Sequence, residues 1–290
     1  MKAKNALEIK ELTKHYPTFQ LKNVNLTLPT GTIVGFIGEN GAGKTTTIKL
    51  ILNELKKESG TIEILGLDYE KNEREIKQQL GVVLDEGFFY DSVTPLQISK
   101  VMACLYANWD QTLYLDFLSK FKLPGKQSIK EFSKGMRMKL SIAAALSHHP
   151  KLLILDEPTN GLDPIVRNEL LDLFLEFIQD EEHSILFSSH ITSDLEKIAD
   201  YICFIHEGEI ILQDSKDTIL ENFALIKCSH EEFKKIDPQD YISYRKNTFG
   251  CEALINDRSY INLKYPNLIL DSVNLETIMM FQILKQEVNK

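Results

Sequence analysis

The stretch GENGAGKTT at residues 38–46 constrains the fold more than any other part of the chain, because it fits the phosphate-binding pattern G-x-x-x-x-G-K-[ST]. The apolar run at residues 33–37 has the length of a strand. Residues 47–52 place apolar side chains at the spacing of a helix that packs on a sheet. A strand, a glycine-rich loop and a helix in this order favour a nucleotide site in an α/β protein over a chance glycine turn.

The residue types of this loop suit a polyphosphate. Glycines allow the backbone to turn its N–H groups inward, and the positive end of the following helix faces the anion. We expect Lys44 to reach the terminal phosphates and the Thr45 hydroxyl to bind Mg²⁺. The expected nucleotide contacts in this stretch are Gly38, Asn40, Gly41, Gly43, Lys44, Thr45 and Thr46.

Length and composition limit the remaining possibilities. The 290 residues allow one large domain or two smaller ones, and 43% hydrophobic with 26% charged residues is typical of a soluble globular protein. No apolar run approaches the roughly 20 residues that span a bilayer, and residues 1–5 show no secretory apolar core, so we expect a cytosolic chain. A net charge of -9 disfavours nucleic-acid binding. The four cysteines form no C-x-x-C pair, and we expect reduced thiols.

Carboxylates follow a second apolar run, at residues 152–155. At the carboxyl end of a strand in an open α/β sheet, side chains meet the ligand crevice. We therefore expect Asp156 to hold Mg²⁺ through its water and Glu157 to orient or deprotonate an attacking water. Asp163 and Pro164 predict a turn into a helix. His190 ends the strand predicted at 184–188 and either bonds a γ-phosphate or is a structural histidine.

Aromatic residues mark two further places. Residues 7–28 alternate in polarity and predict two antiparallel strands joined by a turn near residues 16–18. An aromatic ring there can stack on adenine, with Tyr16 as our first candidate and His15 as the next, although either can be a plain turn residue. The strand predicted at 80–84 ends in carboxylates beside Phe88, Phe89 and Tyr90, which form either a functional cluster or core aromatics under a turn.

The remaining segments give a coarse secondary structure. Residues 95–149 have helical spacing throughout, with Asp110 and Ser133 as expected helix caps. Residues 201–205 and 209–213 predict a hairpin. From residue 215 we expect a short helix, strands around 241–270 and a closing helix at 274–286, without a catalytic constellation.

These motifs, in this order and spacing, resemble the ATP-binding subunit of an ABC transporter over roughly residues 6–214. The segment 108–110, the 132–136 signature variant and the tail are similar to bacterial exporters whose membrane subunits are separate chains. The resemblance implies a P-loop NTPase of the α/β class with a mixed sheet core, an antiparallel β subdomain and an α-helical subdomain at about 86–150. The ABC ATPase domain would span 1–214, and 215–290 would form a small α+β accessory tail.

The resemblance also implies a role for each matching residue. Tyr16 would stack on adenine, Glu157, His190 and Lys44 would be catalytic, and Thr45, Asp156 and Asp85 would hold Mg²⁺. Asp163 is the D-loop aspartate, and Ser133 with Gly135 would bind the γ-phosphate held by the opposite subunit. Lys134, Arg137 and Lys139 would add positive charge near that interface, and Phe88, Phe89 and Tyr90 would form part of the socket for the membrane subunit.

Two positions depart from the family pattern. The signature, usually Leu-Ser-Gly-Gly-Gln, reads Phe-Ser-Lys-Gly-Met at 132–136 and keeps Ser133 and Gly135. The Q-loop glutamine falls at Asp85, with Glu86 beside it. A carboxylate there can still bind Mg²⁺ or water, which leaves its part in coupling open.

The function that the resemblance implies is ATP hydrolysis that drives export through separate membrane subunits. ATP would lie between two head-to-tail domains, so we expect a homodimer or heterodimer at the inner face of the cell membrane. One alternative is a soluble ABC ATPase that acts on ribosomes or DNA, but such relatives carry two domains or long coiled-coil insertions. The other is a non-hydrolysing nucleotide sensor, which the intact Asp156-Glu157 pair and His190 disfavour.

Overall fold

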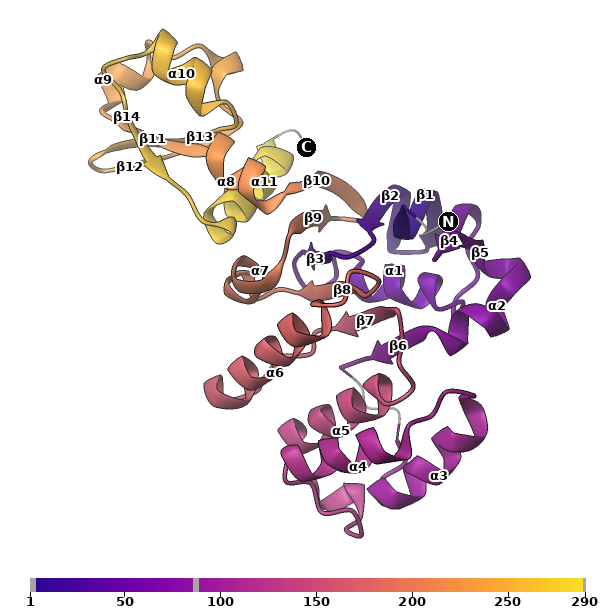
Figure 1. Cartoon of the computed structure of the whole chain (residues 1–290). Helices are drawn as coiled ribbons and strands as arrows, with labels where there is room; N and C mark the ends of the chain where they lie inside the picture. The colour runs from indigo at the N-terminus through magenta and orange to yellow at the C-terminus, as the bar shows by residue number, and fades with distance from the viewer. Residues whose placement is uncertain (1–3, 86–88, 289–290) are drawn as a thin grey trace.

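The computed structural model describes residues 4–85 and 89–288, and within them the strands form three sheets. The central sheet has six strands in the order β10-β9-β3-β8-β7-β6, of which β10 alone pairs antiparallel (Figure 1). Every residue of β3, β7 and β8 is buried, as expected for parallel strands covered on both faces. The strands are β3 (Ile33–Ile37), β6 (Leu80–Val83), β7 (Leu152–Asp156), β8 (Ser184–Ser189), β9 (Tyr201–His206) and β10 (Glu209–Ser215).

A second, antiparallel sheet packs against one face of the central sheet. It has the order β2-β1-β4-β5, with β1 (Asn5–Tyr16), β2 (Phe19–Pro29), β4 (Ser59–Ile64) and β5 (Leu67–Asp68). The predicted hairpin is confirmed, because β1 pairs with β2 up to Tyr16 and Phe19. Between the sheets lie α1 (Lys44–Ile51) and α2 (Tyr69–Gln78), and buried Leu26, Ile48 and Ile154 belong to one core there.

The other face of the central sheet is covered by α6 (Pro164–Phe177) and α7 (Thr192–Ile198), through buried Phe174 and Leu195. The predicted helical segment forms α3 (Pro95–Leu105), α4 (Gln111–Lys120), a 3₁₀ turn (Ile129–Glu131) and α5 (Lys134–Leu146). Both predicted caps are confirmed, because Asp110 accepts a hydrogen bond from the Leu113 N–H and Ser133 accepts one from the Met136 N–H.

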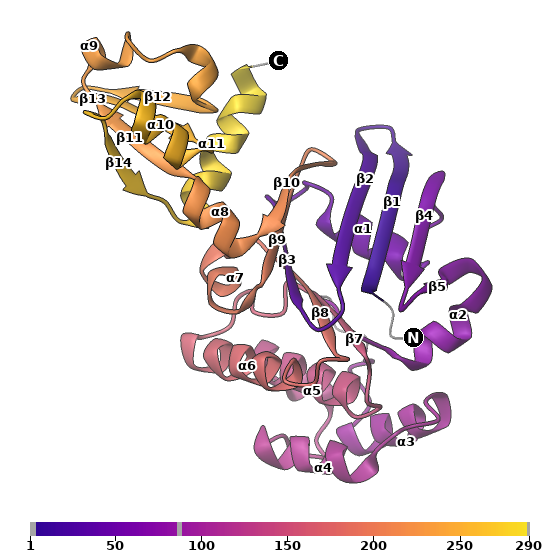
Figure 2. The same ribbon diagram turned by 45° about the horizontal axis from the view of Figure 1, so that its top comes forward.

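The segment after β10 forms a lobe at the opposite end of the molecule from α3, α4 and α5 (Figures 1 and 2). Its antiparallel sheet has the order β12-β13-β11-β14. The strands are β11 (Ala224–Cys228), β12 (Ser243–Asn247), β13 (Gly250–Ile255) and β14 (Ile269–Ser272). The helices are α8 (Lys216–Asn222), α9 (His230–Phe233), α10 (Arg258–Lys264) and α11 (Leu275–Val288), with a 3₁₀ turn at Pro238–Asp240.

The expected short helix and closing helix of this lobe are confirmed, and β12 and β13 lie within the range expected for strands. Helix α10, inside that range, was not predicted, and neither was β11, although it pairs with both β13 and β14. Its apolar run follows α8 directly, and such a short run cannot be distinguished from helix by periodicity. The lobe also joins the main core, since Leu275 and Phe281 of α11 belong to the same cluster as Leu195 of α7. Among the described helices, none combines the length and apolar character needed to cross a bilayer.

Candidate nucleotide site

Three neighbouring parallel strands, β3, β8 and β7, end at the same edge of the central sheet. The phosphate loop (residues 38–43) follows β3, Glu157 follows β7, and His190 follows β8. The carboxyl edge of an open α/β sheet is where ligands of such folds bind. The topology therefore brings together residues that are up to 152 positions apart in the chain, since 190 − 38 = 152.

The phosphate loop has a backbone that requires glycine at several positions. Gly41 and Gly43 have φ of 84° and 115°, in the left-handed region. A Cβ atom on Gly43 would lie 2.8 Å from Leu21 Cδ2 and 2.9 Å from Phe19 Cζ. Gly43 is also the N-cap of α1 and has no side chain to accept from the N–H groups of the first turn. Those groups are therefore oriented for an anion.

Lys44 lies along this loop with its ammonium group buried. Its Nζ donates to the carbonyl oxygens of Gly38 at 2.7 Å and Glu39 at 3.2 Å, and lies 3.2 Å from Glu157 Oε1. The side chain is 5% exposed. A cation beside a glycine-rich loop at a helix N-terminus is a donor set that fits a polyphosphate.

Thr45 and Asp156 meet where the sequence predicts a metal. Thr45 Oγ1 donates to Asp156 Oδ2 at 2.9 Å, and Ser188 Oγ donates to Asp156 Oδ1 at 2.5 Å. A hydroxyl and a carboxylate beside a phosphate-binding loop fit Mg²⁺, which takes few protein ligands and completes its shell with phosphate oxygens and water. Across residues 4–85 and 89–288 no group of three or more His, Cys, Asp or Glu side chains gathers as a metal site.

Glu157 connects the phosphate loop to the end of β8. Its Oε1 lies 3.2 Å from Lys44 Nζ, and its Oε2 lies 2.6 Å from His190 Nδ1 and accepts from the His190 N–H at 3.3 Å. The backbone φ of Glu157 is 51°, in the left-handed region that non-glycine residues rarely adopt. Strained backbone of this kind clusters at functional sites. The Glu157 carboxylate is mostly buried, 12% exposed, between the side chains of Lys44 and His190.

Other predicted residues lie at the rim. Tyr16 ends β1, is 37% exposed, and has its ring centroid 6.5 Å from that of Phe19. Phe19 and Ser188 were missed by the sequence analysis. Phe19 begins the strand after the predicted turn, and Ser188 lies directly opposite Asp156 in the β7–β8 pairing. Ser188 is identified only by the register of β7 on β8, which places it opposite Asp156 and which the sequence pattern does not reveal.

Ser133, Gly135 and Asp163 lie near one another but take no part in the contacts of the phosphate loop described above. Ser133 caps α5, and Asp163 caps α6 by accepting from two backbone N–H groups at 3.1 Å. A Cβ atom on Gly135 would lie 3.8 Å from Leu162 and Val166. The beginning of α5 therefore faces the beginning of α6.

The expected cations near the signature are already paired within the chain. Lys134 Nζ lies 3.0 Å from Asp85 Oδ1, Arg137 pairs with Asp91 at 2.6 Å, and Lys139 pairs with Glu169 at 2.7 Å. Each cation therefore has a carboxylate partner in the same chain, which offsets its charge. Glu86 and Phe88 lie outside the described residues.

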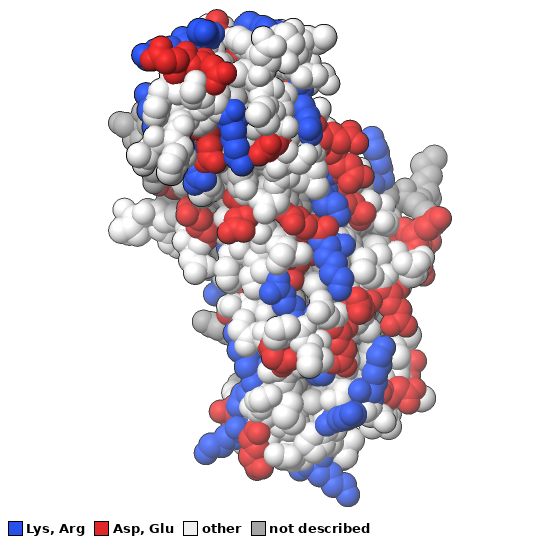
Figure 3. All heavy atoms as spheres, turned by 90° about the vertical axis from the view of Figure 1, so that its left-hand side faces the viewer, with Lys and Arg blue, Asp and Glu red and all other residues white. Residues whose placement is uncertain are grey.

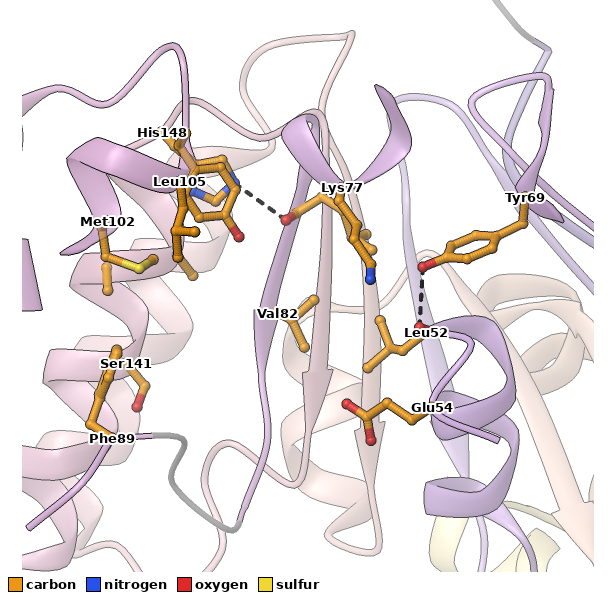
Figure 4. Close-up of a pocket in the computed structure, with 14 residues that line it drawn as sticks. Leu52, Glu54, Tyr69, Lys77, Val82, Phe89, Met102, Leu105, Ser141 and His148 are labelled. Carbon is orange, nitrogen blue, oxygen red and sulfur yellow. Dashed lines mark hydrogen bonds between the residues drawn. The ribbon is translucent and has the colours of Figure 1, made fainter. Parts of the chain in front are cut away.

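A groove of about 320 Å³ lies between α2, α3, α5 and the edge strand β6 of the central sheet (Figure 4). It is mainly apolar and is lined by Leu52, Glu54, Tyr69, Lys77, Leu80, Val82, Phe89, Met102, Leu105, Tyr106, Ser141, Ala144, Ala145 and His148. His148 is 1% exposed, and its ring stacks on Tyr106 with centroids 3.9 Å apart. Burial lowers the pKa of His148 to about 4, so the groove has a neutral imidazole.

Comparisons with known proteins identify the family of the chain. Residues 21–160 match the family model described as ABC transporter. The bacitracin transport ATP-binding protein BcrA of Bacillus licheniformis is 38% identical over 204 residues, covering 69% of this chain and 67% of its own length. The lantibiotic transport ATP-binding protein SrtF of Streptococcus pyogenes is 39% identical over 214 residues, covering 73% of this chain and 91% of its own length.

Solved structures give the same result. An ATP-binding subunit of an ABC transporter is 29% identical, with a TM-score of 0.67 over 74% of this chain and 92% of its own. A dimeric ATP-binding cassette in a post-hydrolysis state with ADP and Pi is 21% identical with a TM-score of 0.64, which supports the fold alone. It follows from the phosphate loop, its carboxylates and these similarities that the chain is an ATP-binding, ATP-hydrolysing subunit and belongs to the ABC transporter family.

Proposed function

We propose that this subunit hydrolyses ATP with Mg²⁺, that Glu157 activates the attacking water, and that the reaction drives export through separate membrane subunits. The observation that carries the proposal is the Glu157 carboxylate, held between Lys44 and His190 at the edge of the sheet. Thr45 and Asp156 meet at the same edge.

Each residue has a distinct part in this proposal. The N–H groups of the phosphate loop and Lys44 bind the polyphosphate, and the Thr45 hydroxyl and Asp156 hold Mg²⁺. Bound Mg²⁺ neutralises charge on the phosphate oxygens. The side chains of Lys44 and His190 can both donate a hydrogen bond to a terminal phosphate. Once they turn to that phosphate, Glu157 is released from both of these contacts and can accept a proton from water.

Replacing Glu157 with glutamine tests this assignment. Glu157→Gln keeps the shape and hydrogen-bonding capacity of the side chain but removes its basicity. We expect the rate of phosphate release to fall by on the order of 100-fold or more, with little change in the affinity for Mg²⁺-ATP. Glu63→Gln, at an exposed position of β4, is the matched control and should keep the wild-type rate. Wild-type phosphate release by a folded Glu157→Gln variant would contradict the proposal.

We also propose that ATP lies between two such domains, in a homodimer or a heterodimer. Ser133 and Asp163 are exposed, and the contacts of Gly135 are with the beginning of α6 instead of the phosphate loop of the same chain. This arrangement suits contacts to a nucleotide bound by a partner. The solved cassette at 21% identity is dimeric, which is a property of that protein.

The α3–α5 groove is our candidate for the docking site of a membrane-subunit helix. Its lining is apolar, and Phe89, singled out by the sequence, belongs to it. Docking there would hold the chain at the inner face of the membrane. The named relatives transport bacitracin and a lantibiotic, and we propose an antibiotic peptide of that kind as the cargo.

The alternatives have less support. Nucleic acids require clustered cations, whereas the net charge is -9, and acidic and basic side chains are interspersed over the face in Figure 3. A sensor that does not hydrolyse ATP would not need the Glu157 carboxylate beside Lys44 and His190. The measured turnover of wild type against Glu157→Gln separates that function from ours.

A further inference from the structure

A second polar network lies next to the nucleotide site and contains none of the residues assigned above. Its centre is Asp194, the third residue of α7, which is 1% exposed. The two carboxylate oxygens have different partners. Thr159 Oγ1 donates to Asp194 Oδ2 at 2.6 Å, and Arg167 Nε donates to Asp194 Oδ1 at 2.5 Å.

The partners of Asp194 come from two segments that carry site residues. Thr159 is 1% exposed and lies two residues after Glu157, in the loop of residues 157–163. Arg167 lies in the first turn of α6, and its backbone N–H donates to the carbonyl oxygen of Asp163 at 3.0 Å, as the helix requires. The Arg167 guanidinium also donates to Ser193 Oγ at 2.8 Å. Asp194 itself lies four residues after His190.

One buried carboxylate therefore joins Thr159 of the 157–163 loop and Arg167 of α6 to the helix that follows His190. Removing a carboxylate from water is costly, and a buried ion pair of this kind is weak evidence for stability. Its directional hydrogen bonds do fix the relative positions of the groups that they join. The groups fixed here are the segments that carry Glu157 and His190, whose side chains lie 2.6 Å apart.

We propose that Asp194 is a positioning residue for ATP hydrolysis, which holds the 157–163 loop and the beginning of α7 in one arrangement through Thr159 and Arg167. Glu157 and His190 then keep the geometry in which both can act on the same terminal phosphate. This inference rests on the proposed roles of Glu157 and His190. Asp194 acts through them and does not itself touch the nucleotide.

The matched pair Thr159→Val and Thr159→Ser tests the connection most cleanly. Valine is close to threonine in shape but lacks the hydroxyl that Asp194 accepts from, whereas serine keeps it. Asp194→Asn removes the charge opposite Arg167. Lys197→Gln is the control, because Lys197 joins the same two helices through Asp172 at 3.2 Å and Asn168 at 3.3 Å, without reaching the 157–163 loop.

We expect kcat to fall about tenfold or more in Thr159→Val and Asp194→Asn, with the KM for ATP within about twofold of wild type, because small misplacements of catalytic groups lower the rate of the chemical step. Thr159→Ser and Lys197→Gln should keep kcat within about twofold. A general structural role would move KM and the melting temperature together and would not distinguish serine from valine.

The inference is overturned if folded Thr159→Val turns over ATP at the wild-type rate, or if Thr159→Ser or Lys197→Gln loses as much kcat as Thr159→Val. If Asp194→Asn does not fold, the two Thr159 variants decide, because neither adds or removes a charge. Glu157→Gln is assayed alongside. If Glu157→Gln hydrolyses ATP at the wild-type rate, the proposed function itself is contradicted. If Glu157→Gln is inactive but Thr159→Val is fully active, only the role of Asp194 is contradicted.

Discussion

Glu157 has a backbone conformation that its neighbours hold in place. A non-glycine residue in the left-handed region costs roughly 1–2 kcal/mol. The Glu157 N–H donates to the carbonyl oxygen of Ser188 at 3.1 Å, and the Glu157 carbonyl oxygen accepts from the Asn160 N–H at 3.1 Å. Ser188 therefore contacts both members of the Asp156-Glu157 pair, through its carbonyl oxygen and its hydroxyl. The strain lies at the residue for which we propose the proton transfer.

His148 gives a prediction about pH and stability. Burial lowers its pKa in the folded protein to about 4, below the usual value of about 6.5. Between these values the unfolded chain binds a proton that the folded protein does not, so stability falls as the pH falls through this window. We expect this histidine to lower the free energy of unfolding at pH 5 by about 2 kcal/mol relative to pH 7.

Urea unfolding of wild type and His148→Gln at both pH values measures this contribution. Glutamine does not titrate in this range and can still donate to the Leu80 carbonyl oxygen, which lies 3.2 Å from His148 Nε2. The difference between pH 7 and pH 5 should be smaller in the variant by about 2 kcal/mol. An equal pH dependence in both proteins would show that His148 has an ordinary pKa.

At the scale of elements, the groove between α3, α5 and the sheet gives a prediction about recruitment. Leu105 lines this groove and is 61% exposed, so Leu105→Glu should not disturb the fold. It should lower the amount of chain that copurifies with membranes containing its membrane subunits by about tenfold, because a buried carboxylate opposes apolar docking. ATPase activity of the isolated chain should not change.

The control for this experiment is Leu263→Glu. Leu263 is 84% exposed on α10, in the lobe formed after β10 and away from the groove. Leu263→Glu makes the same change in charge and hydrophobicity as Leu105→Glu. Equal membrane association of both variants would rule out the groove as the docking site.

Elements that follow from local patterns were predicted well, and contacts that depend on register were not. The apolar runs of β3 and β7, the shorter apolar run within β8, and the caps of α4 and α5 are visible in the sequence. Ser188 and the Asp194 network depend on which strands and helices are neighbours. The pairing of Asp85 with Lys134 likewise joins residues 49 positions apart, since 134 − 85 = 49. Local pattern contains no information on such contacts.

At the scale of the whole molecule, the C-terminal lobe shares a core with the ATPase elements. Phe281 of α11 is fully buried in the cluster that includes Leu195 of α7, and the Leu275 N–H donates to Glu196 Oε1 at 2.7 Å. The sequence predicts residues 215–290 to be a small accessory tail and assigns it no role. Its contact with α7, the helix after His190, gives that tail at least a part in holding the molecule together.

A pair of phenylalanine substitutions tests this shared core. Phe281→Ala should lower the free energy of unfolding by about 3–5 kcal/mol, because it removes a large buried ring. Phe249→Ala removes the same side chain at a position that is 96% exposed, and its effect should stay within about 0.5 kcal/mol. Chemical denaturation of both variants measures the difference. Equal stabilities would mean that α11 contributes little to the core.

The composite nucleotide site is tested by measuring the oligomeric state with light scattering, for wild type and Glu157→Gln, with and without Mg²⁺-ATP. We predict that Glu157→Gln converts from monomer to dimer only with ATP, because binding is kept while hydrolysis, which would separate the dimer, is blocked. Wild type should return to monomer as ATP is consumed. A Glu157→Gln variant that binds ATP and remains a monomer would contradict the composite site formed with Ser133 and Gly135.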